Sequence, residues 1–160
     1  MKKISGFTWI EMLIVIGVVA GLAMLAVPGL QEYAMRKQIK EGLTLAQVAK
    51  TGVQLAYSMK GEMPANNAAA GLPEATKIVG NQVKAVTVEQ GAVTLTFGNN
   101  AAKGLDDKNL TFRPAIVPGE GRVPIAWVCA ATGVPGGMEL LGVDKTDIQM
   151  SWLPVECRGK

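Results

Sequence analysis

The stretch that decides the fold is FTWIEMLIVIGVVAGLAMLAVPGL, Phe7–Leu30, which contains a single charged residue, Glu11. The 20 residues Met12–Gln31 carry no charge, and a helix of about 20 apolar residues can cross a bilayer. Residues 2–3 are both lysine, and the next basic residue is Arg36. This charge asymmetry favours a cytoplasmic N-terminus, so the sequence predicts a membrane-spanning helix followed by an exported region.

Two simpler interpretations of the same stretch remain open at this point. A secretory signal would use Met12–Ala20 as its apolar core and be cut near Ala23 or Ala26. A signal anchor would merely hold an unrelated soluble domain at the membrane. Either one would make the chain a secreted or signal-anchored binding protein. Neither explains Glu11, because a carboxylate in hydrocarbon costs about 2.5–3.5 kcal/mol unless it has a partner.

A cationic partner for Glu11 would exist if the chain were cut after Gly6, which would leave a free amine on Phe7. The amine of a helix points along its own axis, away from its own side chains. The better pairing is therefore with the amine of a neighbouring chain that is shifted along the axis. This reasoning favours assembly of several chains, but it needs a cleavage that the physics alone does not supply.

The heptapeptide Gly6-Phe7-Thr8-Trp9-Ile10-Glu11-Met12 resembles the class III signal peptide of type IV pilins, apart from Trp9, where leucine is usual. The resemblance implies that residues 1–6 are a leader. A prepilin peptidase would cut between Gly6 and Phe7 and methylate the Phe7 amine. Glu11 would then neutralise that amine on a neighbouring subunit during assembly of a helical homopolymer.

Pro28 also matches the family, in which a proline at this register lies in a helical segment that loosens when the filament forms. Beyond it the pattern becomes amphipathic, and one long helix is predicted over Phe7–Met59. Its second half buries residues at steps of three and four, a spacing typical of one helical face. These residues are Ile39, Leu43, Ala46, Ala49, Val53, Ala56 and Met59.

The remainder of the chain is predicted to form a long loop and an antiparallel sheet. Gly61–Asn81 is rich in Gly, Pro and Asn and reads as a loop, with room for one helical turn. Alternating apolar residues predict four strands, and Glu89-Gln90-Gly91 suits a tight hairpin turn. The expected fold is therefore α+β, a long helix packed on a four-stranded antiparallel sheet, the "lollipop" fold of pilins. The strands are expected at Val83–Glu89, Ala92–Phe97, Asn109–Ile116 and Val123–Ala131.

Cys129 and Cys157 are the only cysteines, and in an exported region an even pair indicates a disulfide. Closing a loop of this length is worth roughly 3 kcal/mol in the chain-entropy model. The surrounding residues Trp127–Cys129 and Leu153–Arg158 also resemble the two arms of the disulfide-bounded loop of type IVa pilins. The resemblance implies that loop 129–157 is exposed on the filament and is a candidate site for a host-surface receptor.

The composition argues against catalysis. The chain of 160 residues has no histidine, which excludes Ser-His-Asp and Cys-His mechanisms and leaves a zinc site without imidazole. No metal site, cofactor or enzymatic activity is expected. A net charge of +3 gives nucleic-acid binding no support.

The sequence therefore predicts the major pilin of a type IVa pilus, a structural subunit for adhesion, twitching motility and DNA uptake. Residues 7–30 would form the membrane span and filament core, and residues 31–160 the exported head. The chain would reside in the inner membrane, pass to the inner-membrane assembly machinery, and end in an extracellular pilus. The alternative within the class is a pseudopilin or minor pilin of a type II secretion or pilus system.

Overall fold

A computed structural model describes residues 7–121 and 123–159, and for residues 25–28 it describes the backbone only. The chain divides into two compact units, Met1–Ala34 and Met35–Lys160. The leader expected at residues 1–6, with Gly6, lies outside the described residues. Each unit is described by itself.

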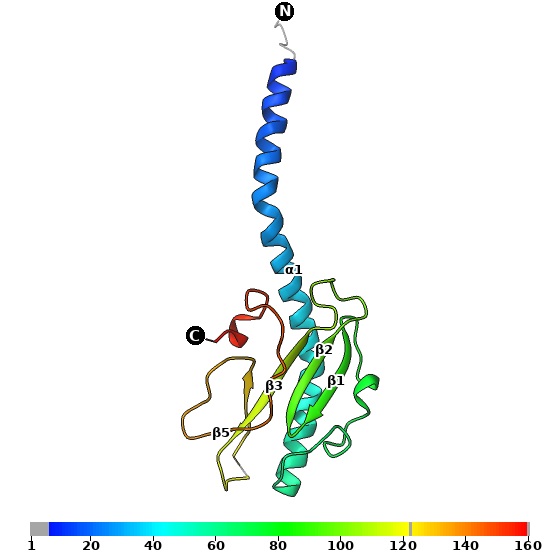
Figure 1. Ribbon diagram of the computed structural model, residues 1–160, viewed down its shortest axis with the longest axis vertical. Helices are drawn as coiled ribbons and strands as arrows, with labels where there is room; N and C mark the ends of the chain where they lie inside the picture. The colour runs from blue at the N-terminus through cyan, green and yellow to red at the C-terminus, as the bar shows by residue number, and fades with distance from the viewer. Residues whose placement is uncertain (1–6, 122, 160) are drawn as a thin grey trace, which may run out of the picture. The chain divides into compact units, whose positions relative to one another are not determined.

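The long helix predicted from the sequence is present as α1, Trp9–Lys60. Its N-terminal part makes up the described portion of the first unit (Figure 1). The apolar side chains of this part are exposed wherever the structure describes them, with Trp9 at 80% and Phe7, just before the helix, at 70%. An apolar surface on every side of a helix is typical of a segment that lies in lipid or inside an assembly.

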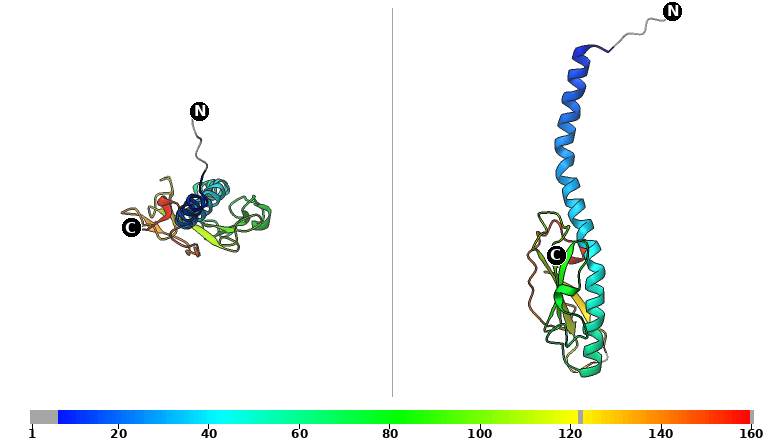
Figure 2. Two further views of the ribbon diagram at one scale, coloured as in Figure 1. Left: turned by 90° about the horizontal axis from the view of Figure 1, so that it is seen from above. Right: turned by 90° about the vertical axis from the view of Figure 1, so that its right-hand side faces the viewer.

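In the second unit, the remainder of α1 packs along one face of an antiparallel sheet (Figures 1 and 2). The helix contributes buried residues at the predicted spacing, from Ile39 to Ala56, and Met59 is exposed, contrary to the prediction. The sheet contributes the alternate, inward-facing residues of its strands, as expected for a two-layer α+β fold. The largest fully buried side chains of the sheet and its loops are Phe97, Leu95, Leu105, Leu110 and Leu153.

The sheet has the order β1-β2-β3-β4, with β5 added on β3. Three predicted strands appear at the predicted residues: β1 is Val83–Glu89, β2 is Ala92–Phe97 and β3 is Asn109–Ile116. The predicted hairpin joins β1 to β2 through Gln90 and Gly91, which have φ angles of 50° and 79°. Two successive positive φ angles are characteristic of the hairpin turn that matches the twist of the strands.

The fourth strand is shorter than predicted, because β4 covers only Ala126–Cys129 instead of Val123–Ala131. At its start, Ala126 is opposite Ala115, next to the last residue of β3, so the residues before it have almost no β3 backbone left to pair with. Pro124 also has no N–H to donate. At its end, Ala130 adopts a φ of 48°, which turns the chain out of the strand.

A fifth strand, β5 (Glu139–Leu140), was not predicted, because two residues give no alternation to recognise. It pairs with the end of β3, where the Leu141 N–H donates to the Pro114 carbonyl. The carbonyl and the nitrogen of a strand residue point to the same side of the strand. The N–H that Pro114 lacks would therefore have pointed to the side of β3 on which β2 has already ended. This explains how a proline fits inside β3. The loop predicted over Gly61–Asn81 is also present and contains one short 3₁₀ turn, Ala75–Lys77.

Candidate functional site

Glu11 lies in the first turn of α1 and is bound by a residue of its own chain. Thr8 precedes the helix, and both its backbone N–H and its hydroxyl donate to Glu11 Oε2 at 2.8 Å. The Glu11 N–H in turn approaches Thr8 Oγ1 at 3.4 Å. This reciprocal arrangement is a capping box, which satisfies backbone donors that the start of a helix leaves unpaired. The spacing Thr-x-x-Glu was readable in the sequence, but the prediction overlooked it.

The segment that follows Glu11 meets the length and hydropathy requirements of a membrane span. Among the described residues, α1 is the one helix that does so, with a mean hydropathy of 2.6 over its most apolar 18 residues. None of that window is buried within the chain. The helical backbone also continues through Pro28, so the structure contains no break at this proline.

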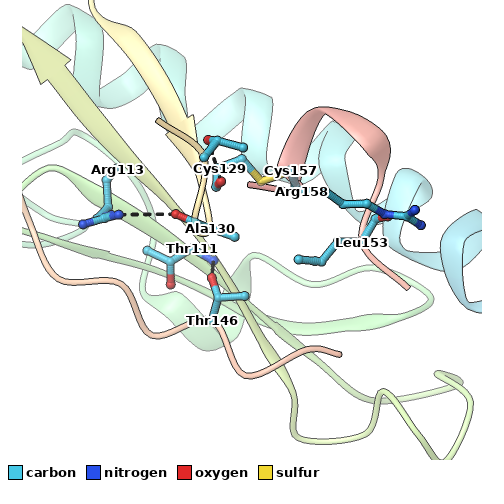
Figure 3. The surroundings of a disulfide bond; sticks show 9 residues. Thr111, Arg113, Cys129, Ala130, Thr146, Leu153, Cys157 and Arg158 are labelled. Carbon is cyan, nitrogen blue, oxygen red and sulfur yellow. Dashed lines mark hydrogen bonds between the residues drawn. A yellow bond between two sulfur atoms is a disulfide. The ribbon is translucent and has the colours of Figure 1, made fainter. Parts of the chain in front are cut away.

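The two cysteines come together as the resemblance implied, in a disulfide between Cys129 at the end of β4 and Cys157 in a short 3₁₀ turn, Val155–Cys157 (Figure 3). Both are buried. Arg158 makes a local hydrogen bond in the same segment, because its Nε donates to the Leu153 carbonyl at 2.9 Å. The disulfide therefore joins the end of β4 to a C-terminal turn that this hydrogen bond holds together.

The disulfide-bounded region crosses the sheet face that points away from α1. The Thr111 N–H donates to Thr146 Oγ1 at 3.0 Å (Figure 3). The Lys145 N–H donates to Thr111 Oγ1 at 3.1 Å. Gly142 is required for this path, because it has a φ of 78° and a β-carbon there would lie 2.6 Å from that of Ala92. No local sequence pattern predicts these contacts.

The part of the region between the disulfide and β5 is open to solvent. Ala131–Pro135 and Arg158 line a recess of about 560 Å³ there. Four of these residues, including Val134 and Pro135, are exposed. This part of loop 129–157 is thus accessible in the single chain, and its exposure on a filament stays a prediction.

Lys50 is the one described ionisable group with a strongly shifted pKa outside the apolar segment. Its side chain turns from α1 toward the sheet, where Nζ lies 3.6 Å from the centre of the Phe112 ring and 5.5 Å from that of Trp127. Burial lowers the pKa of the Lys50 amine to about 8. Within the described residues, no ion pair is found for it. Its role is in the packing of helix on sheet, which no pattern in the sequence predicts.

Comparison with known proteins identifies the family. The family model described as pilin (bacterial filament) matches residues 36–158. A type IV major pilin of Neisseria gonorrhoeae is 34% identical over 160 residues, which cover 96% of this chain and 87% of that protein. A fimbrial protein of Eikenella corrodens is 37% identical over 137 residues, 82% of this chain and 86% of that protein.

A third relative, a fimbrial protein of Neisseria meningitidis serogroup A, is 43% identical over 104 residues. That match covers 62% of this chain and spans only 61% of the meningococcal protein's length. The family model covers most of this chain, and the gonococcal match extends over nearly all of it. The chain therefore belongs to the pilin family.

Proposed function

We propose that the chain is a structural subunit of a type IV pilus that polymerises into a surface filament for adhesion and twitching motility. The observation that carries the proposal is the apolar surface of the first unit, which is exposed at every apolar side chain that the structure describes there. A helix with such a surface needs lipid before assembly and the helices of other subunits after it. A structural role, without catalysis, agrees with the family.

The proposed route to the filament begins in the inner membrane. A prepilin peptidase removes residues 1–6 by cutting between Gly6 and Phe7, and methylates the new amine. The helix from Phe7 to Leu30 holds the subunit in the membrane until the assembly machinery extracts it. The exported head then becomes extracellular, and loop 129–157 presents a candidate surface for a host receptor. DNA uptake is a further proposed role of the filament.

Within the filament, the Glu11 carboxylate pairs with the Phe7 amine of a neighbouring subunit. The Thr8 capping box orients this carboxylate at the start of α1. Its donors are neutral, so they satisfy hydrogen bonds but leave the negative charge in place. A cationic partner is still needed when water is excluded. Pro28 is the position at which α1 is proposed to loosen during assembly.

The substitution Glu11→Gln separates the charge from the cap, because glutamine also serves in a capping box. We expect the variant to be cut normally after Gly6 and to form no surface filaments. The control is Glu41→Gln, which removes an exposed carboxylate from the same helix outside the apolar segment and should leave filaments unchanged. Normal filaments in the Glu11→Gln variant would contradict the proposed pairing.

The intact mass of the chain in material sheared from the cell surface tests the function itself. The proposal requires a chain that begins at Phe7, carries one methyl group and has lost two hydrogens to the disulfide. The same mass confined to the envelope would indicate a pseudopilin or minor pilin. A chain that begins near residues 24–27 would refute the pilin proposal and leave a secreted binding protein.

A further inference from the structure

The outer edge of β1 is occupied by other parts of the second unit. The Asn67 side chain binds both the Val86 carbonyl and the Val88 N–H. Farther along the strand, the Gly80 N–H donates to the Val83 carbonyl at 2.8 Å. Backbone groups that are already hydrogen-bonded cannot pair with the strand of another chain, and native sheets commonly protect their edges in this way.

The outer edge of β4 has open backbone groups at Trp127. Pro114 of β3 is opposite Trp127, and its carbonyl accepts a hydrogen bond from the Leu141 N–H. Leu141 directly follows β5, which lies on the side of β3 away from β4, since both strands pair with Ala115. The Pro114 carbonyl therefore points away from β4, and in such a pair the backbone groups of the opposite residue also point away. The Trp127 N–H and carbonyl thus face the outer edge, and within the described residues neither has a hydrogen-bond partner.

A positive charge lies beside β4 on each face of the sheet. On the inner face, Lys50 Nζ lies 5.5 Å from the centre of the Trp127 ring. On the outer face, Arg113 is opposite Val128, and its Nη2 donates to the Ala130 carbonyl at 3.3 Å (Figure 3). The Arg113 Nε is buried and lacks a hydrogen-bond partner in the described part of the chain. Among the described residues, neither cation forms an ion pair.

A recess of about 230 Å³ adjoins the start of the same edge. It lies between α1 and the residues that lead into β4, and it offers room for a side chain of a strand that continues past β4. Its lining includes Gln54 and Tyr57 from α1, and Pro124 and Ile125 from the segment before β4.

We propose that the outer edge of β4 binds an extended acidic segment of another protein as an additional antiparallel strand. In this mode of recognition, main-chain hydrogen bonds supply affinity and alternate side chains supply specificity. The residue opposite Trp127 accepts from its N–H and donates to its carbonyl. Acidic side chains at the flanking positions face Arg113 on the outer face, and Lys50 adds attraction from the inner face.

The same charges argue against a second copy of this chain as the occupant. Two copies that paired through β4 would bring their own arginines and lysines together, and like charges on neighbouring strands are destabilising. The inference concerns the second unit alone and goes beyond the proposed role in a filament.

The test measures hydrogen exchange at the Trp127 amide by NMR, on the purified full chain in dodecyl maltoside micelles at low salt. The probe is the acetylated and amidated peptide TVEVEVT, whose glutamates share one face when it is extended. Saturating peptide should slow exchange at Trp127 at least about tenfold, because the amide gains a partner. The peptide TVKVKVT should bind at least about tenfold more weakly, since like charges then meet. TVEVEVT that is N-methylated at its three central residues keeps its charges but lacks the donors, and it should not protect Trp127.

Two variants test the choice of an acidic partner. Arg113→Gln should reduce the preference for TVEVEVT over TVKVKVT about fivefold, the contribution of a partly exposed ion pair. The matched control is Lys77→Gln, which removes an exposed charge from the loop before β1 and should leave the preference unchanged. A thermal melt of each variant confirms that it is folded.

Four results would overturn the inference. They are equal binding of the acidic and lysine peptides, equal protection by the N-methylated peptide, an unchanged preference in Arg113→Gln, and slow exchange at Trp127 without any peptide. Slow exchange in the dilute chain would mean that the chain itself covers the edge. Slow exchange only at high concentration would mean that a second copy occupies it. None of these outcomes depends on whether filaments form, which the sheared mass decides separately.

Discussion

Asn67→Ala is expected to lower the free energy of unfolding of the Met35–Lys160 unit by about 3 kcal/mol. Asn67 is buried, and its side-chain amide pairs with the outer edge of β1. Nδ2 donates to the Val86 carbonyl at 2.9 Å, and Oδ1 accepts from the Val88 N–H at 2.7 Å. Nδ2 also donates to the Pro73 carbonyl at 3.0 Å. The Asn67 side chain thus makes the hydrogen bonds that the backbone of one residue in a neighbouring strand would make.

The magnitude follows from what the alanine leaves behind. The Val86 carbonyl and the Val88 N–H would lose their partners in a buried position, and each such group costs about 1–3 kcal/mol. The edge of the sheet admits some water after the truncation, so we take values near the lower end of that range. For a domain of this size, 3 kcal/mol corresponds to a decrease of about 12 °C in Tm.

The assay is thermal unfolding of the full, disulfide-bonded chain in detergent micelles, followed by near-UV circular dichroism. Asn66→Ala is the matched control, because exposed Asn66 makes one side-chain hydrogen bond, to the Ala69 N–H at 2.9 Å. Asn67→Asp keeps the size of the side chain but places an oxygen against two carbonyls, and it should destabilise at least as much as alanine. An aspartate variant as stable as the native chain would refute the reasoning, as would equal effects of alanine at positions 66 and 67.

Three further predictions concern the same unit and use the same unfolding assay. Gly142→Ala should lower the free energy of unfolding by about 2 kcal/mol more than Gly137→Ala does. Both glycines have a positive φ, but only at Gly142 would a β-carbon meet another side chain. Equal decreases in the two variants would contradict this close approach. Replacing Cys129 and Cys157 by serine should lower the free energy of unfolding by about 3 kcal/mol. An unchanged Tm would show that the hydrogen bonds alone fix the C-terminal region. Because the Lys50 pKa is lowered from 10.5 to about 8, the unfolded chain binds more protons between these values, so stability should rise as the pH increases from 8 to 10.5. Lys50→Met should flatten this rise, and an unaltered pH profile in that variant would refute the assignment.

The elements that sequence analysis placed correctly are those whose signals are local. Strands β1, β2 and β3 alternate in hydrophobicity and are bounded by Gly, Asn or turn residues, so both their existence and their ends could be read from the chain. The steps of three and four in the second half of α1 likewise specify one buried face. In each case the information lies within one continuous stretch of the chain.

The features that sequence analysis missed depend on contacts between distant residues. β4 begins where it does because Ala126 is already opposite Ala115, next to the last residue of β3. The path across the outer face depends on Gly142 meeting Ala92, 50 positions away, and nothing near either residue indicates the other. Arg36 and Arg158, which are far apart in the sequence, likewise both donate to the Ser151 carbonyl. Such contacts can be identified only when the folded structure is known.

Thr8 changes what Glu11 requires from a neighbouring subunit. The sequence alone indicates no partner for this carboxylate in its own chain, and that lack favours assembly. In the structure, Thr8 supplies two hydrogen bonds to Glu11 Oε2. What the subunit cannot supply internally is therefore a positive charge rather than a hydrogen-bond donor. A variant that removes the whole side chain, such as Glu11→Ala, disturbs the helix cap and the charge together and cannot tell these roles apart. Glu11→Gln removes the charge alone, so loss of filaments in that variant would have to come from the missing pair with the Phe7 amine.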